Sequence, residues 1–124
     1  MYLLDSNIVI RAFQGYKKEA EFLRDHIKDS SIVISVIMVA EFLVKATDEQ
    51  RVLFDSLVRQ FGSVAIDEEV ARLAGEYRKS FLSKTKKVFL TDCFLAAQAK
   101  VHKLILVTNN KTDFPMKDIE IISP

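Results

Sequence analysis

Residues 2–7 read Tyr2-Leu3-Leu4-Asp5-Ser6-Asn7, a short apolar run that ends abruptly in a carboxylate. The apolar part predicts a buried β-strand, Tyr2–Asp5, followed by a helix that begins near Asn7. Continuous apolar runs of this kind are typical of parallel strands that are buried on both faces. Four later runs, rich in Ile, Val and Leu, predict further strands at Ile32–Ser35, Ser63–Ile66, Leu104–Thr108 and Ile119–Ile122.

Longer stretches with apolar residues at helical spacing fill the gaps between these runs. They predict helices over Lys17–Lys28, Val36–Ala46 with Ser35 as cap, a segment from about Asp48, Glu68–Leu82 with Asp67 as cap, and Asp92–His102 with Thr91 as cap. Strands that alternate with helices predict one α/β domain over residues 1–124, with a mostly parallel sheet flanked by helices.

The composition is that of an ordinary globular domain, with 124 residues, 49% hydrophobic content and a net charge of +1. A single cysteine, Cys93, excludes an internal disulfide and favours a cytoplasmic location. We expect Cys93 to be a small buried hydrophobe rather than a nucleophile. One Cys and two His are too few soft ligands for a tetrahedral zinc site. The longest apolar stretch, residues 32–44, is too short to span a bilayer.

Four carboxylates lie where apolar segments become polar: Asp5, Glu41, Asp92 and Asp113. The carboxyl ends of parallel strands meet at one edge of a sheet, so acids near several strand ends can converge there. Converging carboxylates repel one another, and a divalent cation offsets that repulsion. The pattern therefore favours metal-dependent hydrolysis of a phosphate ester.

Each acid also has an ordinary structural role open to it. Asp5 can cap the first helix, and Asp92 can interact with a helix dipole. Glu41 can pair with Lys45 at the surface, and Asp113 can form a loop turn. Glu41 is the hardest to explain in this way, because apolar residues surround it on every side of its helix.

Charged residues elsewhere suggest solvated faces. Glu19 and the other acids of 17–28 alternate with cations, which indicates an exposed helix face. A basic stretch precedes Asp92 and consists of Arg78, Lys79, Lys84, Lys86 and Lys87. It is either a solvated helix end or a track for RNA phosphates, and its position just before Asp92 favours the track.

Together these residues resemble the PIN-domain ribonucleases, and most closely the small VapC-type toxins of toxin–antitoxin pairs. The resemblance covers essentially the whole chain. Four motifs in the family's order carry it: Leu3-Leu4-Asp5-Ser6-Asn7, Ser35-Val36 through Ala40-Glu41-Phe42, Thr91-Asp92 through Leu95-Ala96-Ala97, and Thr108-Asn109-Asn110 through Asp113-Phe114.

The resemblance implies a five-stranded parallel sheet in the order 3-2-1-4-5, a homodimer, and an antitoxin protein that blocks the site. It also implies an endoribonuclease that depends on Mg²⁺ or Mn²⁺. The metal site would be formed by Asp5, Glu41, Asp92 and, as the fourth group, either Asp113 or Asn110. We interpret three polar residues as groups that orient the acids: Asn7, Thr108 and Asn110.

Two other functions remain open at this level. One is a catalytically quiet PIN-like module that binds RNA or a protein, against which the presence of all four acids argues. The other is a phosphatase or phosphoacceptor domain on a similar α/β scaffold. Such enzymes often need a second Asp two residues after the first, and here that position is Asn7.

Overall fold

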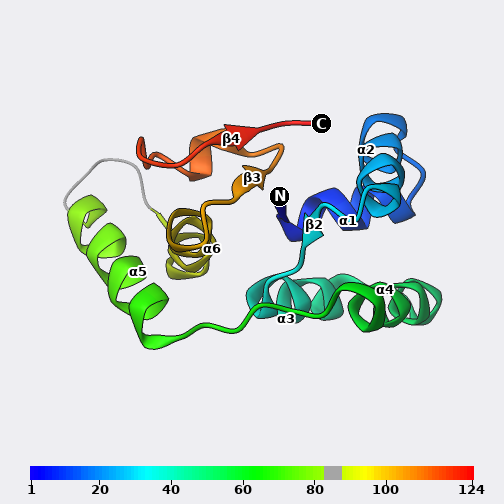
Figure 1. Cartoon of the computed structure of the whole chain (residues 1–124), viewed down its shortest axis with the longest axis horizontal. Helices are drawn as coiled ribbons and strands as arrows, with labels where there is room; N and C mark the ends of the chain where they lie inside the picture. Colours follow the sequence, from blue (N-terminus) through cyan, green and yellow to red (C-terminus); the bar gives the residue numbers. More distant parts are fainter. Residues whose placement is uncertain (83–87) are drawn as a thin grey trace.

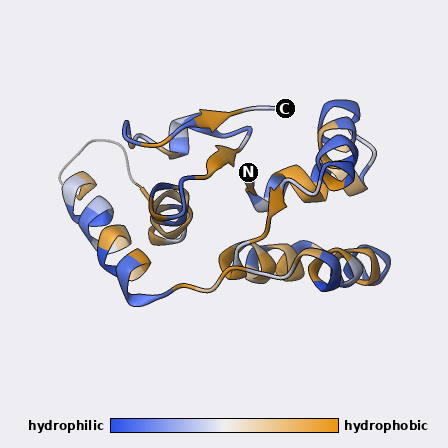
Figure 2. Cartoon of the chain, in the orientation of Figure 1, coloured by the Kyte–Doolittle hydropathy of each residue, from blue (hydrophilic) through white to orange (hydrophobic). Residues whose placement is uncertain are grey.

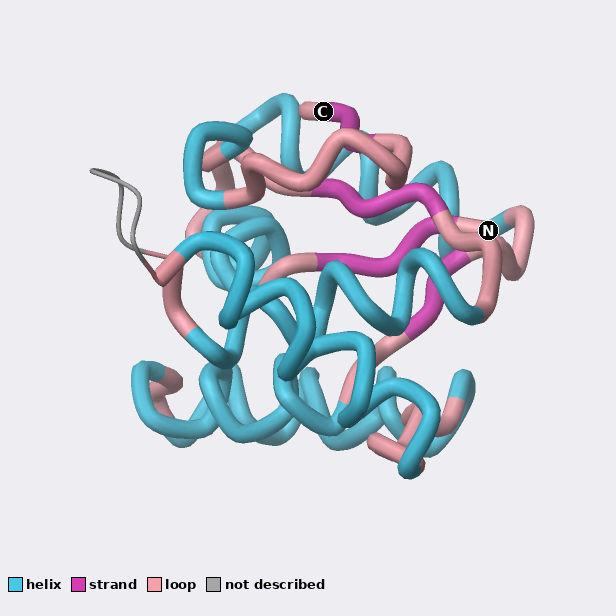
Figure 3. Tube along the Cα trace, turned by 90° about the vertical axis from the view of Figure 1, so that its left-hand side faces the viewer, coloured by secondary structure: helices cyan, strands magenta, loops and turns pink. Residues whose placement is uncertain are grey.

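A parallel sheet in the order β2-β1-β3-β4 lies at the centre of the computed structural model, which describes residues 1–82 and 88–124. Its strands are β1 (Tyr2–Leu4), β2 (Ile32–Val33), β3 (Ile105–Val107) and β4 (Ile121–Ile122). Each pair of neighbours is parallel, so helices must make the crossovers between them. Figure 3 shows the strands side by side with helices around them.

The expected order of five strands is correct for four of them, but the expected strand Ser63–Ile66 is reduced to a single bridge between Ser35 and Val64. Beyond Ser35 the neighbouring segment turns into a helix, so no extended backbone is left to pair with. The carbonyl of Val64 accepts from the backbone amide of Val36 at 3.1 Å. The side-chain amide of Gln98 also donates to the carbonyls of Val64 (3.1 Å) and Ala65 (3.3 Å).

The helices lie close to their predicted positions. They are α1 (Ser6–Phe13), α2 (Lys17–Lys28), α3 (Val36–Lys45), α4 (Asp48–Phe61), α5 (Glu68–Phe81), α6 (Leu90–Val101) and the short 3₁₀ helix η1 (Lys111–Asp113). The predicted caps Ser35 and Asp67 are confirmed, since each accepts a hydrogen bond from a backbone amide of its helix. The predicted cap Thr91 is wrong. Buried Val88 anchors the chain just ahead of α6, and the helix begins at Leu90, before Thr91.

The sheet separates two apolar cores, because successive residues of a strand point to opposite faces. Leu3 and Leu106 belong to the core that includes α5 and α6. Leu4 and Val107 belong to the core that includes residues of α1 to α4. Figure 1 shows α5 and α6 on one side of the strands, α1 and α2 on the other side, and α3 and α4 beyond β2. The strands are apolar along their length (Figure 2), as burial on both faces requires.

Within residues 1–82 and 88–124, no helix is both long enough and apolar enough to cross a lipid bilayer.

Candidate active site

The pairing of β1 with β3 brings Asp5 next to Thr108. Leu4 lies opposite Val107 in the register, so the residues that follow each strand emerge together at the same sheet edge. Both side chains are buried, and the Thr108 hydroxyl donates to Oδ2 of Asp5 at 2.8 Å. The backbone amide of Asn110 donates in turn to the Thr108 hydroxyl at 3.0 Å. The carboxylate of Asp5 is therefore held at a defined orientation.

Asp5 occupies the N-cap position of α1, but its side chain makes no capping hydrogen bond. The capping role that the sequence left open for this carboxylate is therefore not observed. Burial raises the pKa of Asp5, while the bond from Thr108 and the backbone amide of Ser6 lower it. The negative charge of Asp113 raises it further.

Glu41 reaches the same region from α3. Its Oε1 atom is shielded from solvent and has no hydrogen-bond partner in the described part of the chain. Burial raises the pKa of Glu41, and the charge of Asp5 raises it further. The alternative of a surface ion pair with Lys45 is not observed among the described residues. Lys45 only lowers the pKa of Glu41 through its more distant charge.

Asp92 lies in the first turn of α6 and is the most strongly perturbed of these acids. Burial is the largest cause, and the charges of Asp5, Asp113 and Glu41 add to it in that order, so that its pKa is raised to about 7. Asp113 comes from η1. The four carboxylates thus belong to four separate elements, and their electrostatic influence on one another shows that the fold brings them together.

As the side chains stand, no three His, Cys, Asp or Glu residues within 1–82 and 88–124 form a group arranged to hold one metal ion. Mg²⁺, however, commonly takes only one or two carboxylates and keeps several waters. The unpartnered oxygen of Glu41 and the raised pKa of Asp92 are both features that a nearby cation would relieve. An all-oxygen donor set of this kind fits Mg²⁺ or Mn²⁺.

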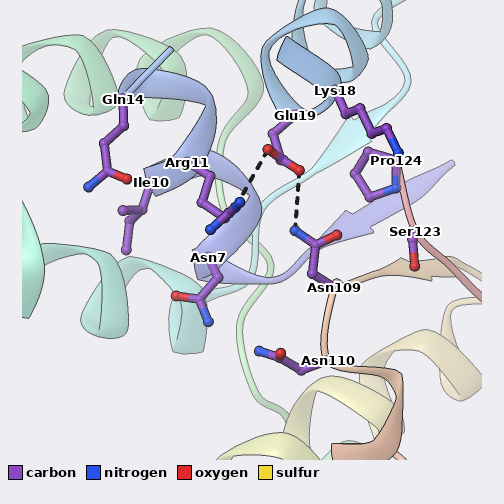
Figure 4. Close-up of a pocket in the computed structure, with 10 residues that line it drawn as sticks. All are labelled: Asn7, Ile10, Arg11, Gln14, Lys18, Glu19, Asn109, Asn110, Ser123 and Pro124. Carbon is purple, nitrogen blue, oxygen red and sulfur yellow. Dashed lines mark hydrogen bonds and ion pairs between the residues drawn. The ribbon is translucent and has the colours of Figure 1, made fainter. Parts of the chain in front are cut away.

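Asn7 and Asn110, also expected to orient the acids, do not bond to an acid of the described chain as Thr108 does. Asn7, on α1, and Asn110, beside η1, line a cavity of about 740 Å³ (Figure 4). Neither side chain makes a hydrogen bond to a carboxylate of the site in the described residues. Only the backbone of Asn110 supports the site, through Thr108.

The sequence interpretation missed a polar network on one wall of this cavity. Glu19, expected on a solvated face, is only 6% exposed. Its Oε2 atom lies 3.5 Å from Nε of Arg11, and its Oε1 atom accepts a hydrogen bond from the side chain of Asn109 at 3.4 Å. One signal was available in the sequence. Glu19 lies four residues before buried Leu23 and so shares its helix face.

The basic stretch is described only in part. Three of its residues lie outside the described part of the chain: Lys84, Lys86 and Lys87. The other two, Arg78 and Lys79, lie in the last turn of α5. The charge of Arg78 lowers the pKa of the Cys93 thiol, which places Arg78 near the start of α6. Cys93 itself is fully buried and its pKa is raised to about 11, first by burial and then by Asp92. Its predicted role as a buried hydrophobe, rather than a nucleophile, agrees with this.

The model of the PIN domain family matches residues 2–119 of this sequence. The chain belongs to the PIN domain family. This PIN domain is 30% identical to ribonuclease VapC10 of Mycobacterium tuberculosis over 116 residues, which cover 94% of this chain and 87% of that protein. The predicted resemblance to PIN-domain ribonucleases of the VapC type is confirmed.

Solved structures share the PIN fold over nearly the whole chain. A chain of VapBC2 from Rickettsia felis, solved with a DNA fragment from its promoter, superimposes with a TM-score of 0.82 at 22% identity, covering 99% of this chain and 98% of that one. A chain of FitAB bound to a DNA fragment superimposes with a TM-score of 0.81 at 25% identity, covering 100% and 95%. A chain of FitAcB from Neisseria gonorrhoeae superimposes with a TM-score of 0.78 at 23% identity, covering 98% and 96%.

Proposed function

We propose that this PIN domain is a metal-dependent endoribonuclease and the toxin of a type II toxin–antitoxin pair. The observation that carries the proposal is the convergence of four carboxylates from four elements. Burial and then the charges of the other three acids raise the pKa of Asp92 to about 7. Fold stability alone does not call for such mutual repulsion, and strongly perturbed acids of this kind cluster at functional sites. The similarity to ribonuclease VapC10 points to RNA as the substrate.

Asp5, Glu41 and Asp92 would hold a Mg²⁺ or Mn²⁺ ion, directly or through waters, and Asp113 would complete the acidic site. Asn110, which lies beside η1, remains the other candidate for the fourth group. When bound, such an ion supplies Lewis acidity that neutralises charge on the phosphodiester and lowers the pKa of the attacking water.

The residues of the chain itself position the substrate and keep the acids in place. The Thr108 hydroxyl fixes the orientation of Asp5, and the amide of Asn110 fixes Thr108. The unpartnered oxygen of Glu41 leaves one acceptor free at the site. Arg78, near the start of α6, offers a cation for the RNA backbone on the approach to Asp92.

The proposed toxin role requires an antitoxin protein, and several of the solved relatives are VapBC or other toxin–antitoxin complexes. Large apolar side chains are exposed close together along α3 and α4: Leu43, Val44, Val52 and Leu53. Others are exposed at the end of α5 and the start of α6: Leu82, Phe89 and Leu90. Exposed apolar surface of this extent supports both an antitoxin contact and the expected homodimer. We also propose a cytoplasmic location, where Cys93 stays reduced.

A cleavage assay tests the proposed activity. The purified chain should cut a structured RNA in Mg²⁺ or Mn²⁺ and stop when EDTA is added. Asp92→Asn should abolish cleavage without unfolding the protein. Binding of RNA with no cleavage under any metal would support a catalytically quiet module instead. Cleavage that continues unchanged in chelator would contradict the metal-dependent mechanism.

A further inference from the structure

The cavity of about 740 Å³ beside the acids is formed by residues of α1, α2, the loop after β3 and the segment after β4 (Figure 4). Asn7 and Asn110 lie at its edge nearest the acidic site, since one follows Asp5 by two residues and the other donates its amide to Thr108. A molecule bound in the cavity would therefore lie next to the substrate bond that reacts at the acidic site. Its volume is within the range of about 300–1,000 Å³ found for small-ligand sites.

The lining of this cavity, here called the amide pocket, contains four side-chain carboxamides: Asn7, Gln14, Asn109 and Asn110. In the described residues, only that of Asn109 makes a side-chain hydrogen bond, to Glu19. The other three keep their donors and acceptors free. A carboxamide presents both a donor and an acceptor, and this pairing matches the edges of nucleobases.

Two cations accompany these amides. The guanidinium of Arg11 lies over the ring of Tyr16 at 3.9 Å and beside Glu19, so its position is set before any ligand arrives. The Arg11 side chain is still 42% exposed, which leaves donors available. Lys18 extends along the opposite edge toward Pro124 (Figure 4). With Glu19 already engaged by Arg11 and Asn109, the pocket has an excess of positive charge for a phosphate.

Two of the lining residues are apolar, Ile10 and Pro124, and neither is aromatic. A peptide partner is usually anchored by large apolar or aromatic side chains in apolar pockets, and this lining offers little of that kind. Amides with free hydrogen-bonding groups next to cations instead suit a polar, anionic ligand with a heterocyclic base. Single-stranded RNA presents such a unit when a base is unstacked.

We infer that the amide pocket binds one nucleotide of single-stranded RNA, adjacent to the phosphodiester that is cut. Arg11 and Lys18 contact the phosphate of this nucleotide, and Gln14 is one of the amides that hydrogen-bond to its base. The inference rests on the proposed function, because it takes RNA to be the substrate. It goes beyond that function in naming the residues that select which RNA is bound.

Binding measured without cleavage tests the electrostatic part. The full chain carrying Asp92→Asn is titrated with short fluorescent oligoribonucleotides of a single base, at several salt concentrations. Lys18→Glu should weaken binding about fivefold or more and make the salt slope less negative by about 0.7, the value for one phosphate neutralised on a single strand. The matched control is Lys17→Glu, which makes the same charge change at an exposed neighbour outside the pocket and should have little effect.

Base selection tests the second part. Gln14 is exposed, so Gln14→Ala should leave the fold intact. It should change the ratio of affinities among oligo-A, oligo-C, oligo-G and oligo-U by about fivefold or more, the discrimination expected from one amide contact to a base edge. A purely structural role would shift all four affinities equally. Gln60→Ala, an exposed glutamine on α4, is the control and should leave the ratios unchanged.

The outcomes separate the two proposals. Suppose that the parent protein cuts RNA, but Lys18→Glu and Gln14→Ala bind all oligonucleotides as their controls do. The proposed nucleotide subsite is then wrong, and the proposed nuclease activity is supported. A polypeptide would then be the better occupant for the cavity. If both variants alter binding as described but no metal supports cleavage, the subsite stands and the proposed catalytic activity fails.

Discussion

The hydroxyl of Thr108 donates a 2.8 Å hydrogen bond to Oδ2 of Asp5, across a separation of 103 residues in the sequence. Both side chains are buried at the carboxyl edge of the sheet, so water cannot replace the bond. The contact therefore ties the first strand to the third at the point where the acids of the proposed site converge.

Replacing Thr108 with Val keeps the shape of the side chain and removes its hydroxyl. We predict a loss of about 1.5–3 kcal/mol in the free energy of unfolding, the range for hydrogen bonds to a charged group. Burial raises the pKa of Asp5 and the bond from Thr108 lowers it, so the loss should be larger near about pH 8 than near about pH 4, because the bond favours the ionised carboxylate. Chemical denaturation at both pH values measures it. Thr108→Ser retains the hydroxyl and should recover most of the stability. Equal losses in the Val and Ser variants would show that only packing matters here.

The stability of the metal-free protein should fall as the pH rises from about 4 to about 7, because of Asp92. Its pKa is raised from 3.8 to about 7 in the folded protein, so the folded state binds a proton that the unfolded state releases over this interval. Asp92→Asn removes this penalty. In EDTA near pH 8 it should melt above the parent by about 3–6 °C, on the order of 1 kcal/mol after allowance for solvent screening.

The same Asp92→Asn variant should melt close to the parent near about pH 3, where Asp92 is protonated in the folded state and largely protonated in the unfolded state. Asp55→Asn, at an exposed acid on α4, is the matched control and should show no such pH-dependent gain. An Asp92→Asn protein that melts far below the parent at every pH, and still cuts RNA at the parental rate, would show that Asp92 is a structural residue of the helix terminus.

Mg²⁺ or Mn²⁺ should raise the melting temperature of the parent protein, because an ion that binds only the folded state stabilises it by mass action. The increase should disappear in Asp92→Asn and shrink in Glu41→Gln, since both acids belong to the proposed site. Thermal melts over a metal titration measure the effect independently of catalysis. The same increase in the parent and in both variants would place the bound ion elsewhere on the protein.

Neutralising Arg78 and Lys79 together should weaken RNA binding and flatten its salt dependence by about 0.7 for each RNA phosphate that is no longer neutralised. The physical reason is the position of Arg78 near the start of α6, which its effect on Cys93 reveals. Arg51→Gln with Arg59→Gln removes the same charge from exposed positions on α4 and serves as the control. If both double variants lose the same affinity, RNA responds only to net charge and not to a track beside Asp92.

Local patterns predicted most of the elements of this fold. The helix over Lys17–Lys28 and the caps Ser35 and Asp67 depend on residues within a few positions of one another, and all three predictions are confirmed. The failures concern contacts over long distances. Ser63–Ile66 forms only one bridge, because the segment that it would pair with turns into α3 directly after Ser35. The side chain of Gln98, more than thirty residues away, supports the Val64 and Ala65 carbonyls there.

The sequence by itself determined the alternation of strands and helices and singled out four acids that border or interrupt apolar segments, because these features follow from periodicity and from neighbours along the chain. Only the tertiary structure decided which side chains meet. The register of Leu4 with Val107 sets Thr108 against Asp5, and the packing of α2 on α1 buries Glu19 against Arg11. Such contacts join residues far apart in the chain or on different helices, and their burial and charge coupling exist only once the sheet and its helices are assembled.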